Sequence, residues 1–239
     1  MTHDTVVFLF DVDNTLLDND RVTQDLRARL SEDFGEAAAD RYFAIFEELR
    51  NEFGFADYLG ALQRLRLEHP RDPRMLGMSS WLLDYPFPER LYPGALTLMA
   101  RVQAYGPAVI LSDGDAVMQP RKIERSGLRA ASHGRVLIYV HKEEMLADVE
   151  RLYPADRYVA FDDKVRLLTA LKRFWGDRVT TVFPRQGHYA VGAEHQADYL
   201  GPDLTLDRIG DALDLDLAAL IAGRNGPAAR KPDPEPPTA

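Results

Sequence analysis

The sequence predicts an α/β protein with a doubly wound parallel sheet and a helical cap insert. Short apolar runs alternate with helical stretches over most of the chain, an order typical of βαβ units whose parallel strands are covered by helices on both faces. A long helical region interrupts this order after the first apolar run. We therefore expect a core of residues 1–17 and 92–222, a helical cap of residues 18–91, and a disordered tail of residues 223–239 that is rich in Pro, Gly and charge.

The first predicted strand and the insert that follows it differ in pattern. Residues 5–10 are continuously apolar and rich in β-branched and aromatic side chains, as in a short strand covered on both faces. Residues 37–53 and 56–67 instead carry aromatic and aliphatic side chains three and four positions apart, which is the period of an amphipathic helix. The insert is therefore expected to be helical.

The rest of the chain alternates between predicted helices and strands. The segment 91–94, Leu-Tyr-Pro-Gly, marks the return from the insert, and a helix over 95–105 ends at a Gly-Pro pair. Further strands are expected over 108–111, 136–140, 158–161 and 179–183, and further helices over 117–125, 143–153, 164–174 and 206–222. Ligands of such folds collect at the carboxyl ends of the strands.

Composition and charge exclude several classes of function. The chain has 239 residues, 46% hydrophobic and 28% charged, and no cysteine, so thiolate catalysis and Cys-ligated metal centres are excluded. Its net charge of −9 without a basic block argues against a nucleic-acid partner. No run reaches the roughly 20 apolar residues that span a bilayer, and the first residues lack the pattern of a secretory signal. We expect a cytoplasmic monomer or homodimer without a membrane partner.

Reactive side chains follow four of the five predicted strands. They are Asp11 and Asp13 after the first strand, Ser112 after the second, Lys142 after the third, and Asp162 and Asp163 after the fourth. Each alone is a common turn or helix-capping residue. Together they place carboxylates, a hydroxyl and a lysine at one edge of the sheet, where carboxylates without a cation would repel each other. This pattern indicates a metal-assisted phosphoryl-transfer site.

The order of these motifs resembles the haloacid dehalogenase-like (HAD) hydrolase superfamily. The resemblance extends over residues 5–215 and rests on the segment 11–15, Asp-Val-Asp-Asn-Thr, directly after an apolar strand, followed by Ser112, Lys142 and the pair Asp162-Asp163. It implies a HAD-like Rossmannoid core, a C1-type cap, and a phosphatase that acts on a small phosphorylated metabolite.

The resemblance also implies roles for individual residues. Asp11 is the expected nucleophile, which forms an aspartyl-phosphate, and Asp13 the expected acid and base. Lys142 is expected to offset the charge of the transition state. Thr15, Ser112 and the backbone N–H of Asp113 are expected to bind phosphoryl oxygens.

A magnesium ion is the cofactor that the resemblance implies. Its expected ligands are Asp11, the backbone carbonyl of Asp13, Asp162 and Asp163, which supply the oxygen atoms that Mg²⁺ prefers. No histidine ligand is required.

Alternatives remain at this stage. Lys164 competes with Lys142, which is followed by two glutamates instead of the Pro-x-Pro frequent in the superfamily. A 2-haloacid dehalogenase would use Asp11 but has no need of Asp13 or a metal, and a phosphosugar mutase would use both aspartates. Outside enzymes of this kind, a receiver-like domain or a catalytically idle phosphate-binding protein also places such residues at strand ends.

Overall fold

The core of the protein is a six-stranded parallel sheet with strand order β3-β2-β1-β4-β5-β6. The computed structural model describes residues 4–190 and 199–223. The strands are β1 (Val6–Phe10), β2 (Ala108–Asp113), β3 (Val136–Tyr139), β4 (Arg157–Phe161), β5 (Val179–Pro184) and β6 (Leu204–Leu206). All adjacent strands are parallel, so the α/β fold class predicted from the sequence is confirmed. The tail expected from residue 223 lies outside the described residues, apart from Gly223 itself.

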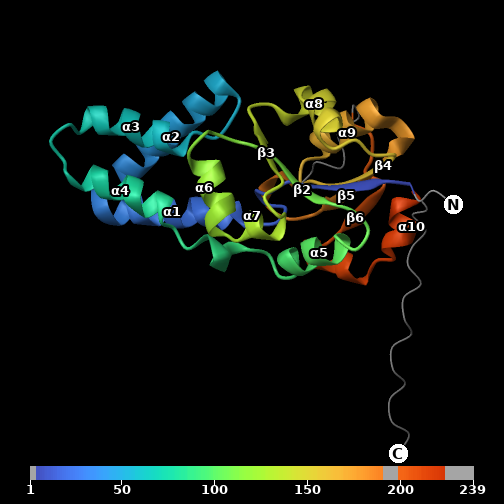
Figure 1. Cartoon of the computed structure of the whole chain (residues 1–239). Coiled ribbons are helices and arrows are strands. Elements are labelled where there is room, and N and C mark those ends of the chain that lie inside the picture. Colours follow the sequence, from blue (N-terminus) through green and yellow to red (C-terminus); the bar gives the residue numbers. More distant parts are fainter. Residues whose placement is uncertain (1–3, 191–198, 224–239) are drawn as a thin grey trace, which may run out of the picture.

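Helices cover both faces of the sheet, as Figure 1 shows. Alternate residues of β1 belong to two separate apolar clusters, with Phe8 and Phe10 in one and Val7 and Leu9 in the other. This explains why the first strand is apolar throughout. The covering helices are α5 (Ala95–Val102), α6 (Met118–Arg125), α7 (Leu128–Ala131) and α10 (Leu217–Ile221) in the first cluster, and α8 (Leu146–Leu152) and α9 (Val165–Trp175) in the second.

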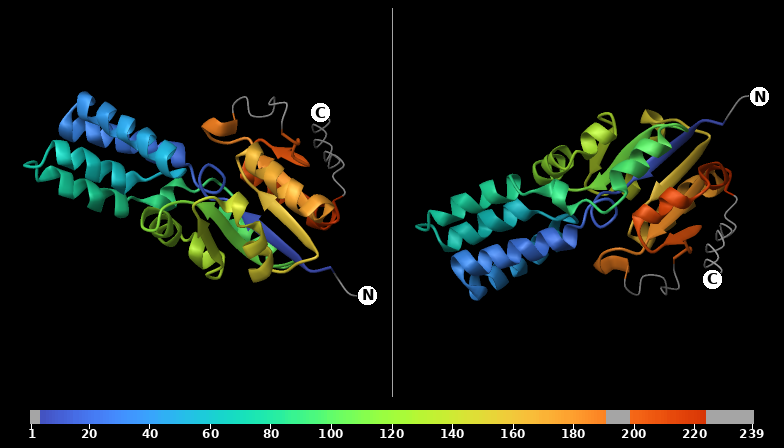
Figure 2. Two further views of the ribbon diagram at one scale, coloured as in Figure 1. Left: turned by 90° about the horizontal axis from the view of Figure 1, so that it is seen from above. Right: turned by 90° about the horizontal axis from the view of Figure 1, so that it is seen from below.

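A helical body is inserted between β1 and α5 and projects from one end of the sheet (Figures 1 and 2). It consists of α1 (Asn19–Phe34), α2 (Glu36–Phe53), α3 (Tyr58–Glu68) and α4 (Arg74–Leu83). Its interior is aromatic: the rings of Phe46 and Tyr58 lie 4.8 Å apart, and the Tyr42 hydroxyl donates to the Tyr58 carbonyl at 2.8 Å. None of the helices in the described ranges is long and apolar enough to cross a membrane.

The helix predicted over 206–222 is wrong. The chain instead forms β6, a 3-10 helix over Ile209–Asp214, and the short α10. Leu206 pairs with Pro184 of β5 and therefore belongs to the sheet. The Asp216 side chain accepts hydrogen bonds from the first backbone N–H groups of α10 and so begins a new helix. Similarly, residues 142–144 form a 3-10 turn, and α8 begins only at Leu146.

Two chain segments, one before α1 and one after α4, connect the helical body to the sheet. Leu17 of the first segment and Leu91 of the second form an antiparallel β-bridge. Beside them, Asp25 of α1 accepts hydrogen bonds from the Tyr85 hydroxyl and from Arg90, whose Nη2 lies 3.0 Å from Asp25 Oδ2. Partial burial opposes ionisation of Asp25, but the hydrogen bonds from Tyr85 and Arg90 outweigh it and lower the pKa of Asp25. An ionised Asp25 therefore stabilises the base of the helical body.

We predict that Asp25→Asn lowers the free energy of unfolding by about 1 kcal/mol at pH 7, because the variant loses charge-assisted hydrogen bonds. The pKa of folded Asp25 lies below its ordinary value of 3.8, so its contribution is complete above pH 3.8 and is lost as the pH falls through the folded pKa. Urea unfolding at pH 7 and pH 3 should show a smaller difference between the two proteins at pH 3. A difference that is the same at both pH values would contradict the prediction. Asp40→Asn, which alters an exposed pair with Arg27, is the matched control and should change little.

Candidate active site

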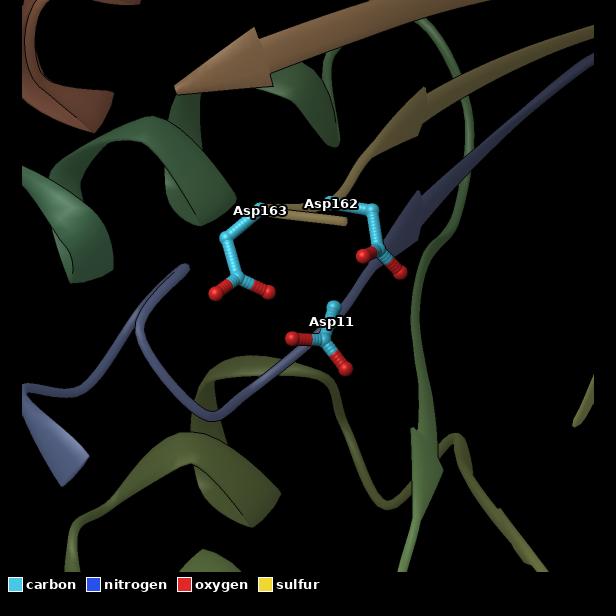
Figure 3. A group of neighbouring side chains, drawn as sticks. All are labelled: Asp11, Asp162 and Asp163. Carbon is cyan, nitrogen blue, oxygen red and sulfur yellow. The ribbon is translucent and has the colours of Figure 1, made fainter. Parts of the chain in front are cut away.

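Three aspartates converge at the carboxyl edge of the sheet, as Figure 3 shows. Asp11 follows β1, while Asp162 and Asp163 follow β4. Because β1 and β4 are adjacent and Phe10 lies opposite Phe161, the next residue of each strand is brought to the same place. Carboxylate oxygens of all three lie within 4.8 Å of one another, and all three side chains are buried.

Lys142 is the buried cation of this cluster. Its Nζ lies 2.6 Å from Asp11 Oδ1 and 2.6 Å from Asp162 Oδ2, and it also donates to the carbonyl of Leu111 at 3.2 Å. Burial opposes the charge, but attraction to Asp11 and Asp162 outweighs it and raises the pKa of Lys142 above its ordinary value. The two carboxylates therefore favour the ammonium form of Lys142, which offsets part of the negative charge.

Both members of the aspartate pair after β4 are buried, which opposes their ionisation. Burial raises the pKa of Asp162 to about 6 against the opposing effect of Lys142. Burial, together with Asp11 and Asp162, raises the pKa of Asp163 well above its ordinary value. Both carboxylate oxygens of Asp163 are buried without a hydrogen-bond partner among the described residues. Such atoms are rare in folded proteins, and a divalent cation with oxygen ligands would satisfy them. The donor set therefore fits Mg²⁺.

Both hydroxyls predicted to bind phosphoryl oxygens are held by hydrogen bonds, and that of Thr15 lies beside these carboxylates. Thr15 Oγ1 donates to Asp11 Oδ2 at 3.1 Å and accepts from the backbone N–H of Asp163 at 3.0 Å. Ser112, near the end of β2, accepts a hydrogen bond from Gln119 Nε2 at 2.9 Å. Each hydroxyl is buried and held by a named partner, so its position is defined before any ligand binds.

The contacts of Lys142 and Lys164, the two candidate lysines, are different. Lys164 donates its backbone N–H to Asp162 Oδ1 at 2.9 Å, and its ammonium lies 5.1 Å from the ring centre of Tyr189. Lys142 is the one whose ammonium contacts the Asp11 carboxylate. Asp113 supports Lys142, because Asp113 Oδ1 accepts from the Lys142 backbone N–H at 2.7 Å.

Asp13 lies apart from the three converging aspartates and has its own lysine. Lys122 Nζ lies 2.6 Å from Asp13 Oδ1, and the Lys122 side chain is fully buried. Sequence reasoning missed Lys122. A signal was present, since Lys122 stands four residues after Met118 and three after Gln119, which places all three on the inward side of α6.

The loop after β1 is held by Gln186, which follows β5. Gln186 Nε2 donates to the carbonyls of Asn14 and Thr15 at 3.2 and 3.0 Å, and its Oε1 accepts from the Ile209 N–H at 2.7 Å. Asn14 adopts φ 60°, a left-handed conformation that asparagine tolerates. At Gly187 a Cβ atom would come within 2.5 Å of the Asn14 side chain, so this close approach requires glycine.

A cleft of about 720 Å³ opens between the helical body and this edge of the sheet. Asp13, Asp113 and Lys164 line it from the core side. From the helical body it is lined by aromatic and charged groups, including Phe43, Phe46, Arg50, Phe55 and Tyr58. The cleft can therefore hold a small polar substrate beside Asp13, Asp113 and Lys164, with its remaining part against aromatic rings. The buried Asp11, Asp162 and Asp163 are not among the residues that line it.

Solved structures with this fold are known. A protein of Burkholderia xenovorans LB400 described as haloacid dehalogenase-like is 57% identical, with a TM-score of 0.85 over 92% of this chain and 100% of that chain. A haloacid dehalogenase-like family hydrolase of Xanthomonas campestris is 21% identical, with a TM-score of 0.63 over 93% and 94% of the two chains. The L-2-haloacid dehalogenase of Xanthobacter autotrophicus with chloropropionic acid covalently bound is 18% identical, with a TM-score of 0.56 over 87% and 97%. The last two likenesses concern the fold alone. No match was found among curated proteins.

The family profile of haloacid dehalogenase-like hydrolases matches residues 5–174, which include β1, the helical body and the aspartate pair after β4. With the similarity to the Burkholderia protein, this match shows that the chain belongs to the haloacid dehalogenase-like hydrolase family.

Proposed function

We propose that the protein is a Mg²⁺-dependent phosphatase that hydrolyses a small phosphomonoester through an aspartyl-phosphate on Asp11. The observation that carries the proposal is the Asp163 carboxylate, which is buried beside Asp11 and Asp162 and has no hydrogen-bond partner within residues 4–190 and 199–223. Burying such a group is unfavourable unless a cation joins it. A phosphatase of this kind needs a cation next to its nucleophile.

The ion would be held by carboxylate oxygens of Asp11, Asp162 and Asp163 and by the backbone carbonyl of Asp13. When bound, Mg²⁺ supplies positive charge that makes a phosphoryl group attackable by a carboxylate. The buried Lys142 supplies a second positive charge at the same edge, fixed by Asp11 and Asp162 before substrate arrives.

The chain's own residues account for both steps of hydrolysis. An oxygen of Asp11 attacks phosphorus, the bond to the leaving oxygen breaks, and Asp13, which enters this step protonated on the oxygen that faces the substrate, gives the leaving oxygen its proton. Asp13 then takes a proton from water as the water attacks phosphorus and releases Asp11 and inorganic phosphate. Ser112 donates to a phosphoryl oxygen that does not transfer, and Thr15 does the same once its hydroxyl, which here donates to Asp11 Oδ2, turns to the substrate.

Asp13 favours this reaction over dehalogenation. Halide leaves carbon without needing a proton, so an acid at the mouth of the cleft has no function in that chemistry. A phosphosugar mutase would use the same Asp11 and Asp13 and would return the phosphoryl group to its substrate.

We predict that purified protein hydrolyses phosphomonoesters with Mg²⁺, and that excess chelator abolishes turnover. Asp11→Asn should lower kcat at least about 1,000-fold, because the variant lacks the nucleophile. Phosphate release from p-nitrophenyl phosphate and a panel of sugar and nucleoside phosphates measures both effects.

Turnover without a metal, or full activity of Asp11→Asn, would contradict the mechanism. Halide release from 2-haloacids without phosphatase activity would identify a dehalogenase instead. Transfer of phosphate between positions of one sugar would identify a mutase.

We also predict that Mg²⁺ raises the melting temperature by about 3–6 °C at tenfold excess over its Kd, as expected for a ligand that binds only the folded state. Asp163→Asn should abolish this shift while it leaves the metal-free melting temperature nearly unchanged, because burial already favours the neutral form of Asp163 and raises its pKa. Thermal unfolding with and without Mg²⁺ measures both. Asp40→Asn, on the exposed side of α2, is the control and should retain the shift. An unaltered shift in Asp163→Asn would argue against this metal site.

A further inference from the structure

Lys122 is a buried ammonium that the proposed reaction does not use. It lies on α6 and is fully buried, which is rare for lysine unless the charge is paired. Its Nζ lies 2.6 Å from Asp13 Oδ1 and 2.9 Å from Asn19 Oδ1. These two acceptors belong to different parts of the molecule, since Asp13 follows β1 and Asn19 begins α1 of the helical body.

Asn19 also contacts other residues that line the cleft. Asn19 Nδ2 donates to the Tyr58 hydroxyl at 3.0 Å, and Thr23 Oγ1 lies 3.2 Å from the same hydroxyl. The Lys122 ammonium itself lies 5.8 Å from the ring centre of Tyr58, on α3. One lysine of the core is thereby in contact with the loop of Asp13 and with two helices of the helical body.

The contact with Asp13 restricts how that side chain can turn. Lys122 holds Oδ1, and the Asp13 carboxylate has no other hydrogen-bond partner among the described residues. Asp13 also lines the cleft. With Oδ1 held from the protein side, Oδ2 is the atom that is left to exchange a proton with a bound substrate. Asp11 differs, because Lys142 and Thr15 each hold one of its two oxygens.

We propose that Lys122 is a positioning residue that orients Asp13 toward the leaving oxygen of the substrate. Through Asn19 and Tyr58, it also makes this orientation depend on the placement of the helical body. The kinetic consequence rests on the proposed phosphatase function. The orientation itself does not, and it can be tested separately.

The kinetic test is Lys122→Met, which keeps the apolar stem and removes the charge. An alkyl phosphate needs a proton on its leaving oxygen, so its kcat/KM should fall about 100-fold, the lower end of what a positioned acid contributes. p-Nitrophenyl phosphate has a leaving group that departs without a proton, so its kcat/KM should fall by less than about fivefold. The ratio kcat/KM is used because it includes the first phosphoryl transfer but not the later attack by water.

Two further variants separate positioning from simple stability. Lys172→Met removes a lysine that pairs with Asp203, and it should change kcat/KM equally for both substrates. Asn19→Ala keeps the Lys122–Asp13 pair but breaks the link to Tyr58, and it should give a smaller selective loss, about threefold to tenfold, on the alkyl phosphate. This variant also tests the proposal if Lys122→Met fails to fold. Equal losses on both substrates in the folded variants would overturn the proposal.

A crystal structure of Lys122→Met tests the orientation without any assay, with Lys122→Leu, a second variant without the charge, as its replacement if the first does not fold. Asp13 should turn away from its present position or occupy several. An unchanged Asp13 side chain would overturn the proposal. If the wild-type protein hydrolyses no phosphomonoester, the proposed function fails, and this structural result alone decides the role of Lys122.

Discussion

The contact between Lys142 and the carboxylates of Asp11 and Asp162 is the interaction on which the rest of the site depends. Three buried aspartates at one sheet edge would repel each other, and the ammonium, 2.6 Å from two of them, offsets part of that repulsion. The arrangement requires the ends of β1 and β4 to be adjacent and the 3-10 turn after β3 to reach over β2. The strand order of the sheet therefore determines the electrostatics of the site.

The central position of β1 explains why the loop after it has so many partners. Phe10 lies opposite Ile110 of β2 on one side and Phe161 of β4 on the other, so the loop begins between the two strand ends that supply Ser112 and Asp162. The same loop leads directly into α1, so the residues that touch the acidic edge and those that begin the helical body are only a few positions apart. A single loop thus connects the residues of the acidic sheet edge to the helical body that lines the cleft.

Much of this arrangement could be predicted from the sequence, because the strands are apolar and end in reactive side chains. Parallel strands bring such ends together whatever the helices between them contain. The prediction failed after residue 203, where the three-residue β6 is too short to show a period and Asp216 begins a new helix. The role of Lys122 could not be predicted for another reason. Helical spacing indicates that it is buried, but its partner Asp13 lies 109 positions away in the chain, and no local pattern encodes that contact. The same holds for the contact of Gln186 with the carbonyl of Asn14, 172 positions away.

The two aspartates of the loop after β1 are held in different ways, and this difference matches the different tasks proposed for them. A nucleophile must meet phosphorus along a fixed line, so a carboxylate held at both oxygens suits Asp11. An acid that later acts as a base must exchange protons with two different oxygen atoms, so a carboxylate held at one oxygen and open to the cleft suits Asp13. Among the residues that the structure describes, the ammonium of Lys142 donates to Asp11, Asp162 and the Leu111 carbonyl at the sheet edge, whereas that of Lys122 also donates to Asn19 of the helical body. Movement of the helical body would therefore act directly on the contact of Lys122 with Asn19, and through Lys122 on Asp13.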